Sequence, residues 1–181
     1  AATGGRLVHN GDDDGSGAGA IVTDTRDLCP GDWFLALKGE RFDGRAFVDE
    51  AIDKGCSGVI METEAGGEKE PELALESRLP RHVGLVLVEG GFADGSGIKT
   101  LHNLARSVRR RYKGKVVAIT GSCGKTTTRT MISHLLRSMG RGNIVHETEG
   151  NRNNLVGLPQ SLLKLPFESP FCVLELGMSA P

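Results

Sequence analysis

The chain has 181 residues, of which 22 are Lys or Arg and 23 are Asp or Glu, so its formal net charge is -1. This length accommodates one large domain or two small ones. The balanced charge gives no general attraction to nucleic acid or to an anionic membrane, and we expect neither as a partner.

The cysteine content bears on the cellular compartment. Four widely spaced cysteines with no Cys-x-x-Cys pair argue against a zinc site and a disulfide framework, and they favour a reducing compartment.

No apolar run reaches the roughly 18 residues that a membrane span needs. We expect a cytoplasmic monomer, or a stromal one if the source is a plant with plastids. Because the chain starts without Met and ends just after an apolar run, we also expect a fragment at both ends.

The first half of the chain alternates apolar runs with one helical pattern. A helix is predicted over residues 45–55, where Phe47, Val48, Ala51 and Ile52 share a face before Gly55. Because apolar runs bounded by glycine fit strands covered on both faces, this order predicts a parallel sheet in an α/β fold. The predicted strands lie within residues 19–26, 32–39, 57–62 and 83–89.

Two polar stretches interrupt this pattern. Residues 10–19 are predicted to form a turn, and residues 64–82 a long surface insertion. The acidic run Asp12, Asp13 and Asp14 lacks the ligand spacing of a calcium loop, so we assign it no function.

A second helix is predicted over residues 97–114. Its apolar face is formed by Ile98, Leu101, Leu104, Ala105 and Val108. The basic run at its end, residues 109–113, is placed where cations meet the negative end of a helix dipole, which we favour over a nucleic-acid patch. We place a domain boundary here, giving domains 1–113 and 114–181.

The second domain begins with a predicted strand, residues 115–120, a glycine loop, and a predicted helix over residues 125–140. The apolar residues of this helix are expected to point inward. They are Met131, Ile132, Leu135, Leu136 and Met139.

The glycine loop resembles a Walker phosphate loop in which Ile119 replaces the first glycine. A loop that runs from a buried strand into a helix N-terminus offers unpaired backbone N–H groups and a positive dipole end to phosphate. Lys125 is expected to reach the β- and γ-phosphates of ATP, and the Thr126 hydroxyl to ligate Mg²⁺. The predicted nucleotide-binding residues are Gly121, Ser122, Cys123, Gly124, Lys125, Thr126 and Thr127.

Glu175 is the candidate for a second Mg²⁺ ligand. It stands near the C-terminal end of an apolar strand, where ligands bind in parallel α/β sheets. The alternative is a solvent-facing glutamate on an edge strand.

Cys123 lies inside the loop. A thiol at a helix N-terminus reacts readily with alkylating agents, although a small loop-filling residue is the simpler explanation for this cysteine. We predict that ATP protects Cys123 from alkylation.

Three separated motifs, TGSCGKTTT, TEGNRNNLVGLPQSLLKL and VLELG, together resemble the Mur ligases. Residues 23–55 also look like the UDP-binding N-terminal domain of that family. The resemblance implies a small UDP-binding α/β domain followed by the beginning of a P-loop central ATPase-type parallel-sheet domain. After VLELG the segment Met178 to Ala180 departs from the polar stretch common in the family.

The resemblance implies an ATP-dependent amide ligase. The substrates it implies are UDP-N-acetylmuramoyl-tripeptide and D-alanyl-D-alanine, joined through an acyl phosphate. Lys125 and Glu175 are then the catalytic residues, with Thr126 and Glu175 on Mg²⁺. One alternative is another ligase of the superfamily: a diaminopimelate- or lysine-adding ligase, a folylpolyglutamate synthetase or a cyanophycin synthetase. The other is a nucleotide- or UDP-sugar-binding module without ligase activity.

The resemblance also implies substrate-binding residues. Asn151, Asn153 and Asn154 are expected to face the muramoyl substrate, while a simple asparagine-rich loop is the alternative. Thr25 and Arg26 are expected to bind the UDP group; for Arg26 a surface ion pair with Asp24 or Asp27 is an equal contender. Asp43 and Gly44 are further candidates.

Overall fold

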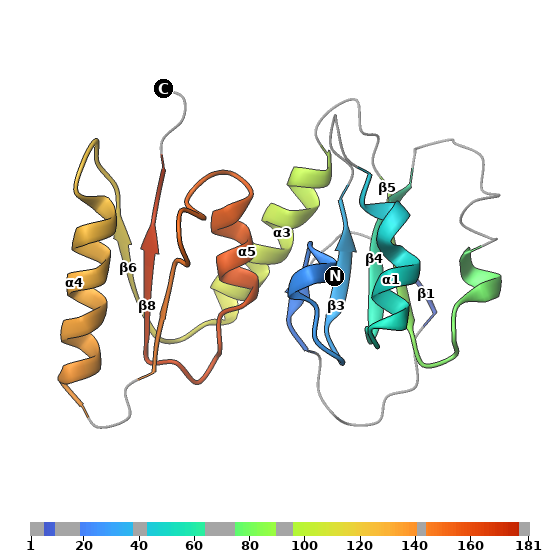
Figure 1. Cartoon of the computed structure of the whole chain (residues 1–181), viewed down its shortest axis with the longest axis horizontal. Helices are drawn as coiled ribbons and strands as arrows, with labels where there is room; N and C mark the ends of the chain where they lie inside the picture. Colours follow the sequence, from blue (N-terminus) through green and yellow to red (C-terminus); the bar gives the residue numbers. More distant parts are fainter. Residues whose placement is uncertain are drawn as a thin grey trace. The chain divides into compact units, whose positions relative to one another are not determined.

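The computed structural model describes residues 6–9, 19–37, 43–63, 75–89, 96–140 and 144–177 (Figure 1). The acidic run 12–14, residues 64–74 of the predicted insertion and the segment 178–180 lie outside the described residues. The chain divides into two compact units, Ala1–Asn103 and Leu104–Pro181. The division falls inside helix α3 (Ser96–Arg111), whereas the sequence predicted a boundary near residue 114.

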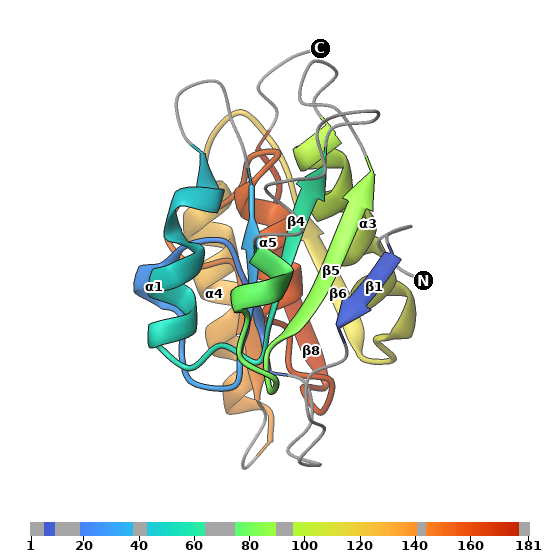
Figure 2. The same ribbon diagram turned by 90° about the vertical axis from the view of Figure 1, so that its right-hand side faces the viewer.

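The first unit is built on a five-stranded sheet in the order β1-β5-β4-β3-β2. Figure 2 shows β1, β5 and β4 side by side. Its strands are β1 (Arg6–His9), β2 (Ile21–Val22), β3 (Trp33–Ala36), β4 (Gly58–Thr63) and β5 (Gly84–Glu89). Strands β2 to β5 are parallel, as predicted, while β1 runs antiparallel to β5. The short run that forms β1 was not predicted.

The core of this unit explains the continuous apolar runs. All six residues of β4 are buried. Helix α1 (Val48–Asp53) packs its buried residues against the apolar side chains of β4, and Thr100 of α3 donates a 3.0 Å hydrogen bond to the buried Glu62 of the same strand. The predicted helix is confirmed as a 3-10 turn, η2 (Gly44–Phe47), followed by α1. The predicted strand 19–26 is shorter than expected, since residues 25–27 form a 3-10 turn, η1.

The second unit holds a three-stranded parallel sheet in the order β6-β8-β7. Its strands are β6 (Lys115–Ile119), β7 (Val145–Glu147) and β8 (Phe171–Glu175), with helices α4 (Lys125–Ser138) and α5 (Gly157–Leu163). On one face, Tyr112 packs with Leu165, Cys172 and Leu174, and its buried hydroxyl donates a 2.7 Å hydrogen bond to the Ser169 carbonyl. On the other face, α4 packs through Ile132 and Leu136.

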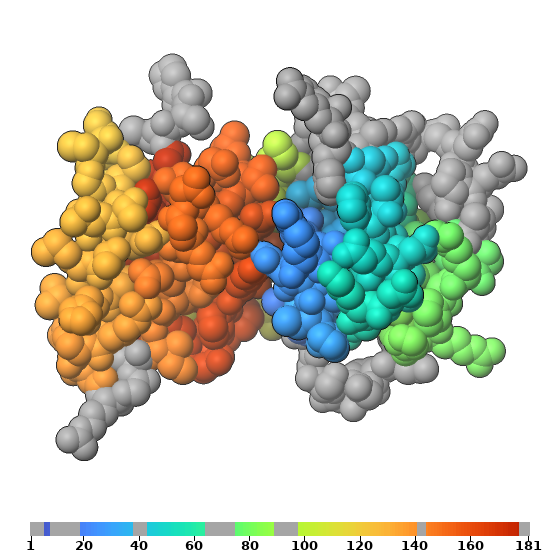
Figure 3. Space-filling view, in the orientation of Figure 1, coloured from blue at the N-terminus to red at the C-terminus, as the bar shows by residue number. Residues whose placement is uncertain are grey.

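The predicted inward face of α4 is partly wrong. Met131, Leu135 and Met139 are 61%, 58% and 77% exposed within the described chain, and α4 forms part of the surface of the second unit (Figure 3). The buried positions of α4 are Arg129 and Ser133. Apolar periodicity takes no account of buried polar side chains, so the face that it predicts is rotated away from Arg129 and Ser133.

Among the described residues, no helix has both the length and the apolar character needed to cross a bilayer.

Candidate functional site

The loop between β6 and α4 has the backbone that phosphate binding requires. Residues 121–124 are exposed, and Gly121 and Gly124 have φ values of 142° and 75°. Residues with a side chain rarely adopt such positive φ values, so glycine is favoured at both positions. Gly124 is the N-cap of α4, and no side chain caps the helix there. The first N–H groups of α4 are therefore available to an anionic ligand.

Lys125 lies across this loop. Its Nζ donates a 2.7 Å hydrogen bond to the Gly121 carbonyl at the loop's opposite end. The bond is solvent-exposed, so exchanging it for a charged phosphate oxygen costs little. The lysine ammonium is thus already at the mouth of the loop.

Thr126 and Glu175 come together next to the loop. Thr126 Oγ1 donates a 3.0 Å hydrogen bond to Glu175 Oε2. Glu175 is only 2% exposed and lies on the central strand of its sheet, so the alternative of a solvent-facing edge residue is wrong. Its other carboxylate oxygen, Oε1, accepts a 2.8 Å hydrogen bond from Asn153 Nδ2. Two polar groups from distant segments therefore fix this carboxylate.

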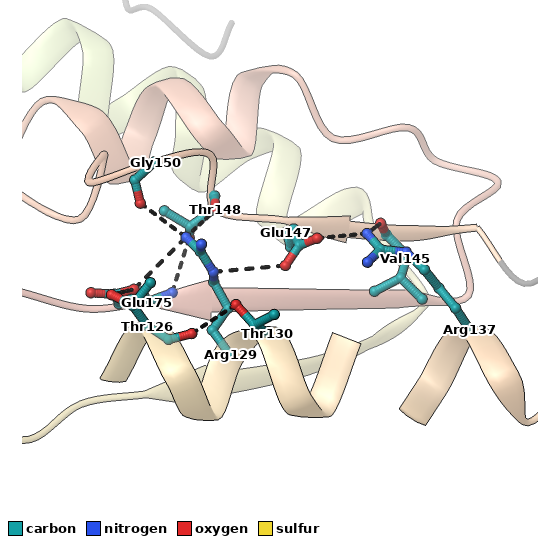
Figure 4. Close-up of polar contacts among 9 residues, drawn as sticks. All are labelled: Thr126, Arg129, Thr130, Arg137, Val145, Glu147, Thr148, Gly150 and Glu175. Carbon is teal, nitrogen blue, oxygen red and sulfur yellow. Dashed lines mark hydrogen bonds and ion pairs between the residues drawn. The ribbon is translucent and has the colours of Figure 1, made fainter. Parts of the chain in front are cut away.

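Arg129, which the sequence analysis did not single out, borders the same carboxylate (Figure 4). It is 8% exposed, and its Nη1 lies 3.7 Å from Glu175 Oε2. Nη1 also donates hydrogen bonds to the carbonyls of Thr148 and Gly150, the latter at 3.0 Å. The only signal in the sequence was its position one helical turn after Lys125, on the same side of α4.

Glu147 on β7 lies on the other side of this guanidinium. Its Oε2 is 3.7 Å from Arg129 Nε, and its Oε1 accepts a 2.6 Å hydrogen bond from Arg137. Burial raises the pKa of Glu147, but side-chain hydrogen bonding, above all from Arg137, and the charges of Arg137 and Arg129 outweigh burial and leave the pKa below its ordinary value. Glu147 is therefore ionised at neutral pH.

The segment after β7 carries the three predicted asparagines, and they differ in surroundings. Asn153 contacts Glu175, as described above, and its carbonyl accepts a 2.7 Å hydrogen bond from the Gly177 amide. Asn154 Oδ1 instead accepts hydrogen bonds from the amides of Val156 and Gly157, at 3.1 and 2.8 Å, and so holds the turn into α5. Asn151 is exposed.

In the first unit, Thr25 and Arg26 belong to η1 directly after β2. Thr25 is buried, and its carbonyl accepts a 2.8 Å hydrogen bond from Lys54 Nζ. Arg26 has a side chain 85% exposed and pairs with Asp24 at 2.6 Å. Its expected surface ion pair is therefore present, with Asp24 as the partner.

Asp43 and Gly44 repeat this arrangement after β3. The Asp43 carboxylate accepts a 3.0 Å hydrogen bond from the Arg45 amide and pairs with the Arg45 side chain at 2.6 Å. Gly44 is buried, and a β-carbon there would lie 2.6 Å from the Leu37 carbonyl oxygen, so only glycine fits. Arg45 was not predicted, although the spacing Asp-x-Arg at both turns was visible in the sequence.

Two family models match the chain. Residues 19–84 match the model described as Mur ligase family, catalytic domain, and residues 119–181 match the model described as Mur ligase middle domain.

Several curated relatives of the chain carry the name UDP-N-acetylmuramoyl-tripeptide--D-alanyl-D-alanine ligase. The chain is 36% identical to the Bacillus subtilis protein over 160 residues, which are 88% of this chain and 31% of the relative. It is 37% identical to the Escherichia coli protein over 158 residues, 87% of this chain and 30% of the relative. The chain thus spans about a third of the length of the curated relatives it matches.

Solved structures of MurF also match the chain. A crystal structure of MurF from Acinetobacter baumannii matches with a TM-score of 0.67 and 31% identity, covering 99% of this chain and 34% of that one. The MurF ligase from Thermotoga maritima in complex with ADP matches with a TM-score of 0.64 and 34% identity, covering 91% of this chain and 33% of that one.

Proposed function

Because the chain belongs to the Mur ligase family, we propose that the protein containing it is an ATP-dependent amide ligase that joins D-alanyl-D-alanine to UDP-N-acetylmuramoyl-tripeptide. The observation that carries this proposal is the uncapped phosphate loop with Thr126 hydrogen-bonded to the buried Glu175. The relatives named for this reaction match both units of the chain. We further propose that the protein is a cytoplasmic monomer, which size-exclusion chromatography and cell fractionation would check.

The segment that carries the phosphate loop is basic. Between Asp94 and Glu147 the sequence has eleven Lys or Arg residues and no Asp or Glu, although the net charge of the whole chain is only -1. Lys125 is the cation of this segment that lies at the loop itself, where it can meet an anion such as ATP. The basic run at the end of α3 instead precedes β6, at the opposite end of that strand from the loop.

The reaction transfers the γ-phosphoryl group of ATP to the substrate carboxylate, forming an acyl phosphate and ADP. The amine of D-alanyl-D-alanine then attacks the acyl carbon, the amide bond forms, and inorganic phosphate leaves. Such a transfer depends on alignment and charge neutralisation more than on a covalent catalyst. In this chain, the loop amides and Lys125 would bind and align the phosphates.

The residues beside the loop fit Mg²⁺. A threonine hydroxyl and a carboxylate are the hard oxygen donors that this ion prefers, and phosphate oxygens and water complete its shell. Thr126 and Glu175 would hold the ion. When bound, it would neutralise charge on the β- and γ-phosphates. The buried position of Glu175, with Asn153 on its other oxygen, keeps this carboxylate directed at the loop.

We assign the UDP-linked substrate to the first domain, residues 1–113, and the nucleotide to the second, residues 114–181. The exposed guanidinium of Arg26 is the group best placed to meet a diphosphate, after exchanging its partner Asp24. Thr25, Asp43 and Gly44 would shape the same subsite through the turns that follow β2 and β3. Asn151 and Asn153 would lie toward the muramoyl substrate, while Asn154 acts through the turn into α5.

The test is substrate-dependent phosphate release by the protein that contains this chain. UDP-N-acetylmuramoyl-tripeptide with D-alanyl-D-alanine is expected to release phosphate, whereas diaminopimelate, lysine or glutamate as the amine is not. Lys125→Ala should abolish this release, and Lys113→Ala, an exposed lysine outside the loop, should retain it. Equal release with the other amines would favour another ligase of the family. No release, together with intact nucleotide binding, would favour a binding module. The 181-residue chain alone is expected to lack ligation, because it covers about a third of those ligases.

A further inference from the structure

We infer that Arg129 is a positioning residue for Mg²⁺-nucleotide binding, acting through Glu175 and the backbone of residues 148–150 rather than by touching the ligand. The inference rests on the proposed function, because it gives Arg129 a role at the same phosphate site. Nothing in the loop motif requires a cation at this position; only the folded arrangement shows its contacts.

The contacts of Arg129 are concentrated on one nitrogen. Nη1 donates to the carbonyls of Thr148 and Gly150 and lies 3.7 Å from Glu175 Oε2. Nε, although buried, makes no hydrogen bond within the described chain and lies 3.7 Å from Glu147 Oε2. The position of Nη1, not the whole guanidinium fork, therefore carries the interaction.

The segment after β7 is tied to Glu175 from two directions. The Glu175 amide donates a 2.9 Å hydrogen bond to Thr148 Oγ1, while Arg129 holds the Thr148 and Gly150 carbonyls. Asn153, which donates to Glu175 Oε1, follows within the same segment. Losing Arg129 would thus loosen both the Glu175 carboxylate and the Asn153 side-chain amide that orients this carboxylate.

Charge gives a second reason for the inference. Arg129 lies between two carboxylates, those of Glu147 and Glu175, whose side chains are 25% and 3% exposed. A buried carboxylate is costly unless cations or hydrogen bonds compensate it. Glu147 has Arg137 as a second cation, but within the described chain Arg129 is the one cation in ion-pair distance of Glu175.

The geometry predicts which substitution should rescue the site. A lysine ammonium is a compact charge with three donors, so in Arg129→Lys the ammonium can take over the contacts of Nη1. Arg129→Met keeps the length of the side chain without charge or donors. Arg129→Gln keeps donors for the two carbonyls but removes the charge, and it provides a second variant in case the methionine variant does not fold. Arg137→Met is the matched control, because it removes a cation of the same helix that contacts Glu147 and the Val145 carbonyl rather than Glu175.

The experiment measures the affinity of the protein for a fluorescent ADP analogue during a Mg²⁺ titration, with circular dichroism as the folding check. Arg129→Met and Arg129→Gln are expected to shift the Mg²⁺ half-saturation upward by about 10- to 100-fold, as the loss of residues that orient metal ligands does elsewhere. Their affinity in EDTA should stay near wild type, because the loop and Lys125 are intact. Arg129→Lys should return the Mg²⁺ half-saturation most of the way to the wild-type value. Arg137→Met should leave the half-saturation at the wild-type value.

The outcomes separate this inference from the function on which it rests. Folded Arg129→Met and Arg129→Gln variants with the wild-type Mg²⁺ dependence would overturn the role of Arg129 and leave the proposed function standing. A loss of affinity equal in Mg²⁺ and in EDTA would also overturn it, since that is the signature of a merely structural residue. A wild-type protein that binds no ADP at any Mg²⁺ concentration would overturn both.

Discussion

Thr126 and Glu175 are 49 residues apart in the chain, yet Thr126 Oγ1 donates a 3.0 Å hydrogen bond to Glu175 Oε2. The parallel register of the sheet brings them together, because Ile119 at the end of β6 pairs with Glu175 at the end of β8. The loop and helix that follow β6 therefore start beside the last residue of the central strand.

The first prediction concerns this pair. Glu175→Gln keeps the shape and the contact with Thr126 but removes the charge that a Mg²⁺ ligand needs. We expect the Mg²⁺ half-saturation for ADP binding to rise by about 100-fold, in the upper range for disturbed metal sites. Isothermal titration calorimetry with and without Mg²⁺ measures this. Glu149→Gln, at a glutamate with a side chain 66% exposed, is the control and should bind as wild type.

The second prediction concerns Gly124. Its φ of 75° is strained for a residue with a β-carbon, while no heavy atom would lie within 4 Å of that β-carbon. Gly124→Ala should therefore destabilise the fold by about 1–2 kcal/mol through backbone strain rather than collision. Urea unfolding measures the difference. Gly124→Asn should cost less, because asparagine tolerates the left-handed region; equal losses for both variants would contradict the strain explanation.

The third prediction uses the cysteines as probes. Cys29 and Cys123 are exposed, whereas Cys56 and Cys172 are buried. Burial raises the pKa of Cys172 to about 11, which keeps this thiol protonated and inert at neutral pH. In a Cys29→Ser variant, iodoacetamide should label Cys123 alone, and Mg²⁺-ATP should slow the labelling. Peptide mass spectrometry reads the site. Equal rates with and without ATP would contradict the placement of the nucleotide in the loop.

The fourth prediction concerns pH. Burial lowers the pKa of His146 below its ordinary value of 6.5, although a 2.7 Å contact between Nε2 and the Ser161 carbonyl opposes the shift. The imidazole of His146 therefore binds a proton less readily in the folded state than in the unfolded state. The contribution of His146 to the unfolding free energy is present above pH 6.5 and is lost as the pH falls below 6.5 toward the lowered folded-state pKa.

The measurement compares the wild type with His146→Gln, whose amide can still donate to Ser161. The difference in unfolding free energy between the two proteins should shrink between pH 7.5 and about pH 5, since only the wild type gains a proton on unfolding there. A difference independent of pH would count against a half-buried, neutral imidazole at His146.

The phosphate loop was predictable because its determinants are contiguous. Glycines at 121 and 124, Lys125 and Thr126 follow one strand directly, so local backbone rules suffice to recognise them. Glu175 was predicted by a weaker argument, the tendency of ligands to lie at the carboxyl ends of parallel strands. Its burial on the central strand needed the sheet order, which the sequence does not show.

Arg129 and the face of α4 were missed for a related reason. A helix that packs against a polar loop buries polar residues, and apolar periodicity assigns these to the solvent side. Asn154 was grouped with Asn151 and Asn153 by spacing alone. Its hydrogen bonds to Val156 and Gly157 depend on where α5 begins.

The sequence by itself determined the parallel α/β class, most strands, the phosphate loop and the resemblance to the Mur ligases, since each depends on neighbouring residues or on short motifs. Only the tertiary structure decided which side chains surround Glu175. That set comes from α4, from the segment after β7 and from β8, and no local periodicity links them. Burial of a carboxylate requires compensating cations or hydrogen-bond donors, and here they come from separate elements, so Arg129 becomes visible only in the folded chain.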